Sequence, residues 1–188
     1  RHIIEIPGDA PTGFWTLELR VDPADKRATT SFRFGVEEFM PERMKLDISS
    51  SQKILNVAQP FKLAVQGDYL YGAPAAGNRL LGVAQFERNK NPLTQKLPGF
   101  EFGDSNEDSQ KKRVELEERT LNDEGHADID IDLGPASGKR SPYTVRATLS
   151  LLESGGRPVI RSIERTLWPA PVLVGIRPLF VGEYAREG

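Results

Sequence analysis

Apolar and polar side chains alternate along most of this chain with a period of two residues. The alternation is clearest over residues 143–151, where Tyr143, Val145, Leu149 and Leu151 share one face with Ala147 and are separated by polar residues. This period places alternate side chains on opposite faces of an extended strand, whereas an amphipathic helix repeats its apolar positions every three to four residues. The pattern therefore predicts half-buried β-strands, and no segment has a convincing helical period.

Seven such strands are expected between residues 44 and 167. They lie at residues 44–48, 61–69, 80–86, 114–116, 129–133, 143–151 and 159–167, with turn sequences at 122–125 and 154–156 among the links. Only residues 110–121 invite a helical alternative. There Val114 and Leu116 lie two residues apart, which favours a strand with a charged outer face. Seven short alternating strands predict an all-β fold, a seven-stranded antiparallel β-sandwich.

A hairpin is expected before this series. Residues 15–21 and 32–36 alternate in the same way, and residues 22–26 between them contain Pro23 and two aspartates, which favour a turn. Residues 2–6 are expected to form a shorter third strand. The side chains expected to be buried in the hairpin and the sandwich are Trp15, Leu17, Phe34, Phe61, Leu63, Tyr143, Val145 and Leu149.

Proline-containing links divide the chain into three expected parts. Residues 1–40 are interpreted as the C-terminal strands of a preceding domain, 41–169 as one complete sandwich, and 170–188 as a linker and the start of a next domain. Pro41 would end a strand ladder because proline has no backbone N–H, and the run from Pro169 to Pro171 is a stiff link. The polar stretch 89–108 is long for a hairpin loop and is expected to be a surface excursion or partly disordered. Because the sequence begins at Arg1, without Met or a signal peptide, we interpret it as an excised fragment.

Composition narrows the classes of function. The chain has 188 residues, 25 Lys and Arg against 27 Asp and Glu, and a net charge of -2. Its basic residues are scattered, so neither nucleic acid nor an anionic membrane surface is expected as a partner. The longest apolar stretch, residues 172–176, is far shorter than the roughly 20 residues of a membrane span. The absence of cysteine excludes thiol nucleophiles, disulfides and thiolate-bound zinc or iron–sulfur clusters from these residues.

Three carboxylates, Asp128, Asp130 and Asp132, alternate along one expected strand at intervals of roughly 7 Å. They invite a calcium interpretation. The EF-hand template requires Gly at its sixth position and Glu at its twelfth, where this sequence has Leu133 and Lys139. A calcium site at the sandwich edge could still use two of these carboxylates. We favour a solvated strand face, which serves solubility and discourages edge pairing.

Other candidate motifs fail on the residues that their chemistry requires. Residues 72–77 have the glycine spacing of a phosphate-binding loop, but Asn78 and Arg79 stand where Lys and Ser or Thr are needed, and no helix is expected to follow. This stretch is interpreted as a tight bend. His2 and His126 are too few for a metal site or a catalytic base and are expected at the surface. No serine lies in a nucleophile elbow. We assign no catalytic, cofactor-binding or metal-binding residue and expect no enzyme.

Three phrases of the sequence resemble the α2-macroglobulin family. Residues 36–46, VEEFMPERMKL, resemble the junction between successive macroglobulin-like domains, where a last strand ends in Val-Glu-Glu-aromatic and a Pro follows. Residues 68–77, DYLYGAPAAG, resemble a Tyr-x-Tyr/Phe-Gly-x-Pro-x-x-Gly segment in its bacterial form. PYTVRA at 142–147, followed by RSI at 161–163, resembles the closing hairpin of such a domain. The resemblance spans nearly the whole chain.

The resemblance implies a string of macroglobulin-like, fibronectin-III-like sandwiches, with parts of neighbouring domains here, that build the cage of a broad-range endopeptidase inhibitor. In this family a proteinase cuts an exposed bait segment, and a thioester from a Cys-x-Glu-Gln motif captures it covalently. Without cysteine, the thioester cannot lie within these residues. No bait segment is identified either, because the stretch 89–108 fits better inside one sandwich. The fragment is therefore expected to be scaffold.

The bacterial form implies a periplasmic lipoprotein anchored at the inner membrane, a role in evasion of host defence, and association with a bifunctional peptidoglycan synthase. Endopeptidases and the neighbouring domains of the same chain are the other implied partners. An alternative is an immunoglobulin-like adhesin or protein-binding module, which would repeat one domain many times. A β-sandwich enzyme or carbohydrate-binding module would need a carboxylate pair in a cleft or an exposed aromatic platform, whereas Trp15 and Trp168 fall on expected strands.

Overall fold

The computed structural model describes residues 3–37, 42–153 and 157–179. Backbone contacts divide the chain into two compact units, Arg1–Pro41 and Glu42–Gly188. Pro41 and the turn at 154–156, both singled out in the sequence, lie outside the described residues, as does His2.

The first unit contains the predicted hairpin. Strands β1 (Gly13–Leu19) and β2 (Thr30–Val36) pair antiparallel, with Trp15 opposite Phe34 and Leu17 opposite Phe32. Two predictions about this unit are wrong. Residues 3–6 are not a strand, and the apolar face of the hairpin is not buried, since Leu17 is 42% exposed and Trp15 and Phe34 are only half-buried. Burial of a strand face needs a second layer to pack against, and the described residues of this unit supply only one two-stranded ribbon.

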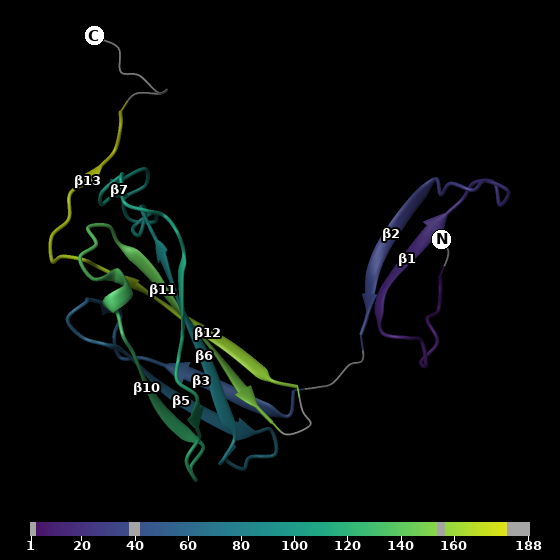
Figure 1. The fold of residues 1–188 in the computed structure, drawn as a ribbon, viewed down its shortest axis with the longest axis horizontal. Helices are drawn as coiled ribbons and strands as arrows, with labels where there is room; N and C mark the ends of the chain where they lie inside the picture. Colours follow the sequence, from purple (N-terminus) through teal and green to yellow (C-terminus); the bar gives the residue numbers. More distant parts are fainter. Residues whose placement is uncertain (1–2, 38–41, 154–156, 180–188) are drawn as a thin grey trace. The chain divides into compact units, whose positions relative to one another are not determined.

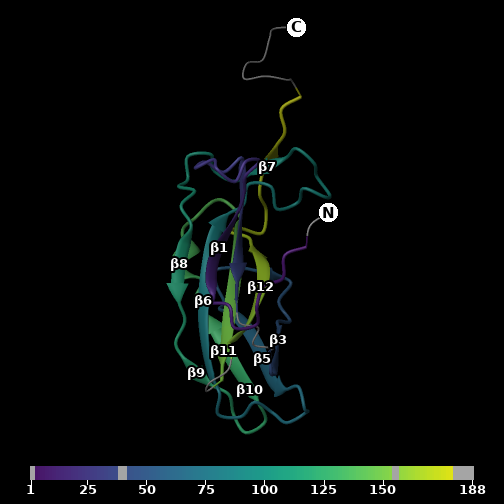
Figure 2. The same ribbon diagram turned by 90° about the vertical axis from the view of Figure 1, so that its right-hand side faces the viewer.

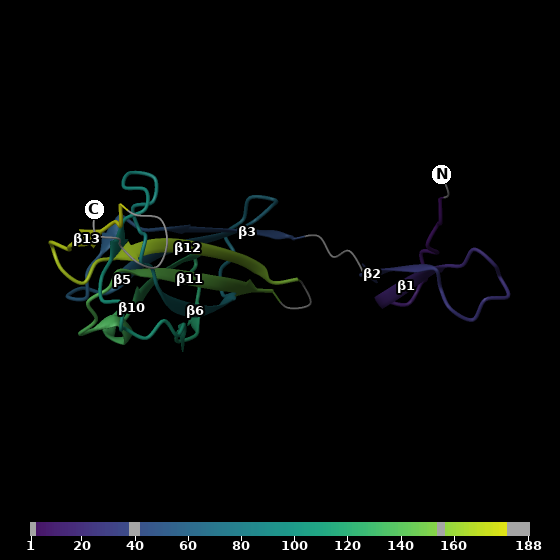
Figure 3. The ribbon, with the colours of Figure 1, turned by 90° about the horizontal axis from the view of Figure 1, so that it is seen from above.

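The second unit contains a three-stranded sheet and a larger sheet (Figure 1). The smaller sheet has the order β10-β5-β3, formed by His126–Ile131, Phe61–Tyr69 and Met44–Ser49. The larger sheet has the order β4-β12-β11-β6-β8, formed by Ile54–Leu55, Val159–Leu167, Tyr143–Leu152, Arg79–Arg88 and Lys112–Glu115. Figure 3 shows β12, β11 and β6 next to one another. Figure 2 shows β8 at the edge beside β6, with which the short strand β9 (Arg119–Thr120) also pairs.

All seven strands predicted for the sandwich are present, namely β3, β5, β6, β8, β10, β11 and β12. Their pairings are antiparallel. The four strands that the sequence did not predict, β4, β7 (Glu101–Phe102), β9 and β13 (Gly175–Ile176), have two residues each. Of these, β4 pairs with β12 in parallel and β13 pairs with β7. Two residues are too short for an alternation pattern, so the sequence signal used here could not detect these strands.

The core lies between the inner faces of the two sheets. The smaller sheet contributes Phe61 and Leu63, and β11 contributes Tyr143, Val145 and Leu149, each at most 4% exposed. These five predictions of burial are confirmed. Burial of each large apolar side chain stabilises the fold by roughly 1.5–3 kcal/mol, so these positions contribute substantially to the stability of the sandwich.

Candidate functional site

The acidic strand face lies at the surface. Asp128 and Asp130 point outward from β10 and alternate with the buried side chains of Ile129 and Ile131. The only close partner of Asp128 among the described side chains is His126, whose Nε2 lies 3.4 Å from Oδ1. Asp132 accepts a 2.9 Å hydrogen bond from the backbone N–H of Gly134 and so stabilises the turn after the strand. Within the described ranges, no three His, Asp or Glu side chains are grouped closely enough to hold a metal ion.

The glycine-rich loop at 72–77 folds back onto its own strand. The backbone N–H of Ala75 donates to the carbonyl oxygen of Gly67 at 2.9 Å, and that of Gly77 donates to Leu121 at 3.0 Å. The side chain of Asn78 donates to the Tyr69 hydroxyl at 3.0 Å, which fixes the exit of the loop. These N–H groups are used within the sandwich and do not form a cradle for a phosphate. The loop is a bend, as expected from its residues.

The turn at 122–125 closes onto this loop. The carbonyl oxygen of Gly125 accepts a 2.9 Å hydrogen bond from the N–H of Gly67. Gly125 has a φ of +76°, and a Cβ placed on it would lie 2.4 Å from the Gly67 carbonyl oxygen. Only glycine fits both this backbone conformation and this approach. The segment 68–77, which resembles the family, and the turn at 122–125 therefore pack together in one joint.

A polar network ties the long stretch 89–108 to the larger sheet. Arg88, at the end of β6, donates to the Ser141 hydroxyl at 3.1 Å, to the carbonyl oxygen of Glu107 at 2.7 Å and to that of Asp104. Ser141 is fully buried, and its hydroxyl also accepts a 3.0 Å hydrogen bond from the N–H of Asp104. Of the two expectations for this stretch, the structure therefore describes a surface excursion, which half-buried hydrogen bonds to Arg88 and Ser141 anchor to the sheet.

Glu107 is the carboxylate at the centre of this network. Its Oε2 accepts a 2.9 Å hydrogen bond from the backbone N–H of Ser141, and its Oε1 accepts one from the N–H of Arg140. Burial raises the pKa of the Glu107 carboxyl, but the hydrogen bonds from Ser141 and Arg140 outweigh burial and hold the pKa below its ordinary value. The ionised form is therefore part of the folded structure, and its partners are the backbone of the sandwich.

The chain that leaves β12 packs along the same stretch. We call residues 168–179 the exit segment. Its strand β13 pairs with β7, and Trp168 meets the Phe102 ring edge-on at 6.2 Å between centroids. The guanidinium of Arg177 lies 5.2 Å from the centre of the Phe100 ring. A Cβ on Gly175 would lie 2.6 Å from the Phe102 ring, so this position requires glycine for close packing. The long stretch thus acts as a buttress for the exit segment.

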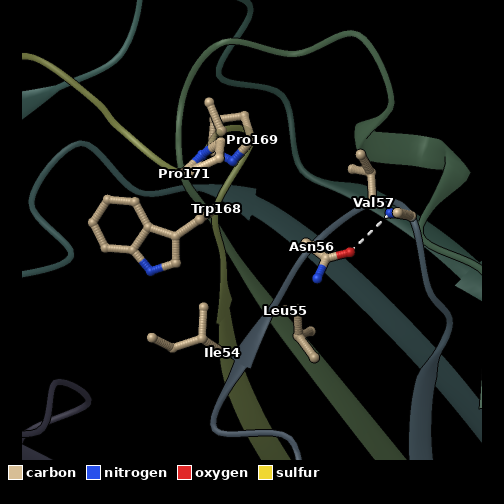
Figure 4. Close-up of a pocket in the computed structure, with 9 residues that line it drawn as sticks. Ile54, Leu55, Asn56, Val57, Trp168, Pro169 and Pro171 are labelled. Carbon is tan, nitrogen blue, oxygen red and sulfur yellow. Dashed lines mark hydrogen bonds between the residues drawn. The ribbon is translucent and has the colours of Figure 1, made fainter.

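An apolar groove lies at the start of the exit segment (Figure 4). It has a volume of about 710 Å³ and is lined by residues 54–58 and 168–171. We call it the exit groove. Ile54 and the indole of Trp168 stand on one side of it, and Val57 lies across from them in the close-up. The lining has no charged side chain, and its aliphatic, indole and proline groups favour apolar occupants.

Sequence reasoning missed this site for a specific reason. It singled out the Pro169–Pro171 link but placed Trp168 on a strand, whereas β12 ends at Leu167. It did not identify β4, which forms the facing wall. The cluster of Trp168 with three following Pro and Ala residues was the available signal.

No helix in the described parts of the chain is long and apolar enough to cross a membrane.

The comparisons with known proteins agree with this architecture. Residues 42–169 match the family model described as the bacterial alpha-2-macroglobulin MG5 domain. Alpha-2-macroglobulin from Xylella fastidiosa (strain Temecula1) is 47% identical over 176 residues, which cover 94% of this chain and 11% of that protein.

Two solved structures extend the comparison to the fold. The native conformation of Escherichia coli alpha-2-macroglobulin matches with a TM-score of 0.75 and 37% identity, over 95% of this chain and 11% of that one. Trypsin-activated alpha-2-macroglobulin from E. coli matches with a TM-score of 0.67 and 38% identity, over 91% and 11%. The chain thus spans about a tenth of the length of these relatives. These matches confirm the predicted macroglobulin-like sandwich, and the chain belongs to the bacterial alpha-2-macroglobulin family.

Proposed function

We propose that this chain is a scaffold section of a broad-range endopeptidase inhibitor that traps proteinases after its bait segment is cut. The observation that carries the proposal is the match of residues 42–169 to the MG5 domain model. One matching structure is described as trypsin-activated, which supports endopeptidases as the partners of the whole protein. Because the chain spans about a tenth of its relatives, trapping belongs to the full-length protein and not to these residues alone.

The way the polar side chains are used supports a structural rather than an enzymatic role. In the part of the chain that the structure describes, every buried side-chain nitrogen or oxygen has a hydrogen-bond partner. Arg88 and Glu107 bind backbone atoms and join the long stretch to the sheet. A general base or nucleophile instead needs a free lone pair that faces a substrate. We therefore assign the chain to the architecture of the trap.

Family membership also leads us to propose a location and further partners. We propose that the full-length parent is a periplasmic lipoprotein anchored at the inner membrane, in line with the bacterial members that the sequence resembles. We further propose that it contacts a bifunctional peptidoglycan synthase and serves evasion of host defence. Fractionation of cells with and without globomycin, which blocks lipoprotein processing, tests the anchor. Recovery of the mature parent in the soluble fraction of untreated cells would contradict it.

Covalent capture by the full-length parent tests the trapping function. The parent is incubated with trypsin and with a second, unrelated endopeptidase, with and without methylamine pretreatment, and run on a denaturing gel. We expect an upward shift by the mass of each proteinase that methylamine abolishes, because the amine consumes the thioester first. No adduct with either enzyme would reject the thioester trap and leave only the scaffold fold. The similar proteins are alpha-2-macroglobulins, which favours the inhibitor over the adhesin alternative.

A further inference from the structure

We propose that the exit groove is the docking site for an apolar side chain of the domain that follows in the same polypeptide. This proposal deepens the scaffold role proposed above and rests on it. It assigns a function to a surface of the sandwich that the buried core does not use, and it names the chemistry of its partner.

The lining of the exit groove selects an apolar occupant. Aliphatic, aromatic and proline side chains form most of it, and its polar groups are the amide of Asn56 and the indole N–H of Trp168. The Oδ1 of Asn56 already accepts a 3.0 Å hydrogen bond from the N–H of Ala58 (Figure 4). A charged group entering the groove would lose hydration and meet no oppositely charged side chain in the lining. Ile54 is 62% exposed and Val57 38%, so apolar surface remains to be covered.

The walls of the groove are held in place before anything binds. Ile54 and Leu55 pair with the end of β12, and the N–H of Trp168 donates to the carbonyl oxygen of Leu55 at 2.9 Å. Gln52, which precedes β4, accepts hydrogen bonds from Arg165 at 2.7 Å and from the N–H of Lys62 at 2.8 Å. A preformed groove loses little conformational entropy on binding. The exit groove is therefore organised to receive a side chain.

The position of the groove identifies the occupant as the following domain. The MG5 match ends at residue 169, inside the wall of the groove, and the exit segment runs on from there. Beyond the groove, Val172, Val174 and Leu179 are 83%, 78% and 87% exposed. Exposed apolar side chains thus recur along the chain that leads onward from the apolar groove, where a following domain would cover them.

Because the following domain is tethered to the sandwich, a groove of this size is sufficient to dock it. A separate partner would have to offset the loss of translational and rotational freedom on binding. A domain joined by a short link instead binds intramolecularly, at an effective concentration in the millimolar range. The pairing of β13 with β7 in the long stretch shortens the free link further, because it fixes the exit segment up to Ile176. One or two apolar contacts are then enough to orient the following domain.

Hydroxyl-radical footprinting tests this docking without any proteinase. Side-chain reactivity is compared by mass spectrometry between the 188-residue chain and the full-length parent. We expect Ile54, Val57 and Trp168 to lose reactivity in the parent. Ile160, which is 51% exposed on β12 and does not line the groove, serves as the internal reference. Equal reactivity of the groove residues in both proteins would overturn the proposal.

A matched pair of variants in the parent tests the chemistry. Ile54→Glu should restore the reactivity of Val57 and Trp168 to that of the 188-residue chain, whereas Ile160→Glu should leave their protection intact. Protection that disappears on dilution would assign the groove to a second copy, and protection that appears only with proteinase would assign it to the proteinase. Either result overturns the proposal. Covalent capture of trypsin is measured on the same preparations. Protected groove residues without capture would reject the trapping function alone, and capture with unprotected groove residues would reject the docking proposal alone.

Discussion

Replacement of Gly125 by alanine tests the joint between the turn at 122–125 and the glycine-rich loop. Gly125 has a φ of +76°, and an added Cβ would lie 2.4 Å from the carbonyl oxygen of Gly67. Gly77 offers a matched control, because its φ is +74° and no heavy atom lies within 4 Å of its added Cβ. The two substitutions therefore carry the same backbone penalty and differ only in the steric contact.

The expected loss of stability has two contributions, the left-handed backbone conformation and the contact with the Gly67 carbonyl oxygen. Alanine in the left-handed region costs about 1–2 kcal/mol at either position. At Gly125 the contact with a backbone oxygen adds about 1–3 kcal/mol of overpacking, because the Gly67 carbonyl is held by the N–H of Ala75 at 2.9 Å and cannot move freely. We expect Gly125→Ala to lower the free energy of unfolding by about 2–5 kcal/mol and Gly77→Ala by about 1–2 kcal/mol.

Urea unfolding of the 188-residue chain measures the difference. Trp15→Phe is placed in all variants, so that the fluorescence of Trp168 alone reports on the sandwich. The linear dependence of the free energy on urea concentration gives each value, provided that the slopes agree. If Gly125→Ala and Gly77→Ala were equally stable, the contact with Gly67 would not be tight, and the reasoning about this joint would be refuted.

Four other predictions concern the polar network, the buttress and the domain junction. Ser141→Ala should destabilise the sandwich by about 1–3 kcal/mol, because the half-buried donors of Arg88 and Asp104 lose the fully buried Ser141 hydroxyl as their acceptor. Ser137→Ala, at an exposed position, should change the urea midpoint little. Folding lowers the pKa of Glu107, so the unfolded state binds more protons than the folded state at acidic pH. The free energy of unfolding should therefore fall as the pH drops from about 4.3, the pKa of an unperturbed glutamate, through the folded-state pKa. Glu107→Gln should remove this component of the acid sensitivity, and an unchanged pH dependence of the urea midpoint would contradict it. Gly175→Val should separate β13 from β7 and speed chymotryptic cleavage of the exit segment after Leu173, with little change in the urea midpoint, and unchanged cleavage would reject the packing of the exit segment against β7. If the stiff junction at Pro41 transmits the rearrangement that follows bait cleavage, Pro41→Gly in the full-length protein should weaken the conformational response to proteinase. An unchanged response would argue against this role of the junction.

The local alternation of side chains was enough to predict the main strands. A strand such as β11 buries one face and exposes the other, so its sequence carries the pattern directly. The turn at 122–125 was also visible, because Asn122 accepts backbone hydrogen bonds with its side chain and glycine supplies the positive φ. Both signals depend on residues close together in the chain.

The features that the sequence did not predict depend on contacts between distant residues. β4 and β13 are defined only by their partners β12 and β7. The Arg88–Ser141 contact joins residues 53 positions apart, and nothing in the neighbourhood of either residue marks it. The apolar pattern of β1 correctly predicted a strand, but it could not show whether a second layer covers Leu17. The exit groove was missed because its two walls come from segments more than 100 residues apart.

The most direct test of the scaffold claim is covalent capture by a full-length variant without the acidic strand face. Asp128, Asp130 and Asp132 are replaced together by Asn, which keeps the size of each side chain and the acceptor that holds Gly134. Trypsin capture is scored on a denaturing gel beside the unsubstituted parent. The account predicts the same yield of adduct, because these carboxylates contact solvent and supply no chemistry. Loss of capture in a folded variant would contradict it and show that this section takes part in the reaction.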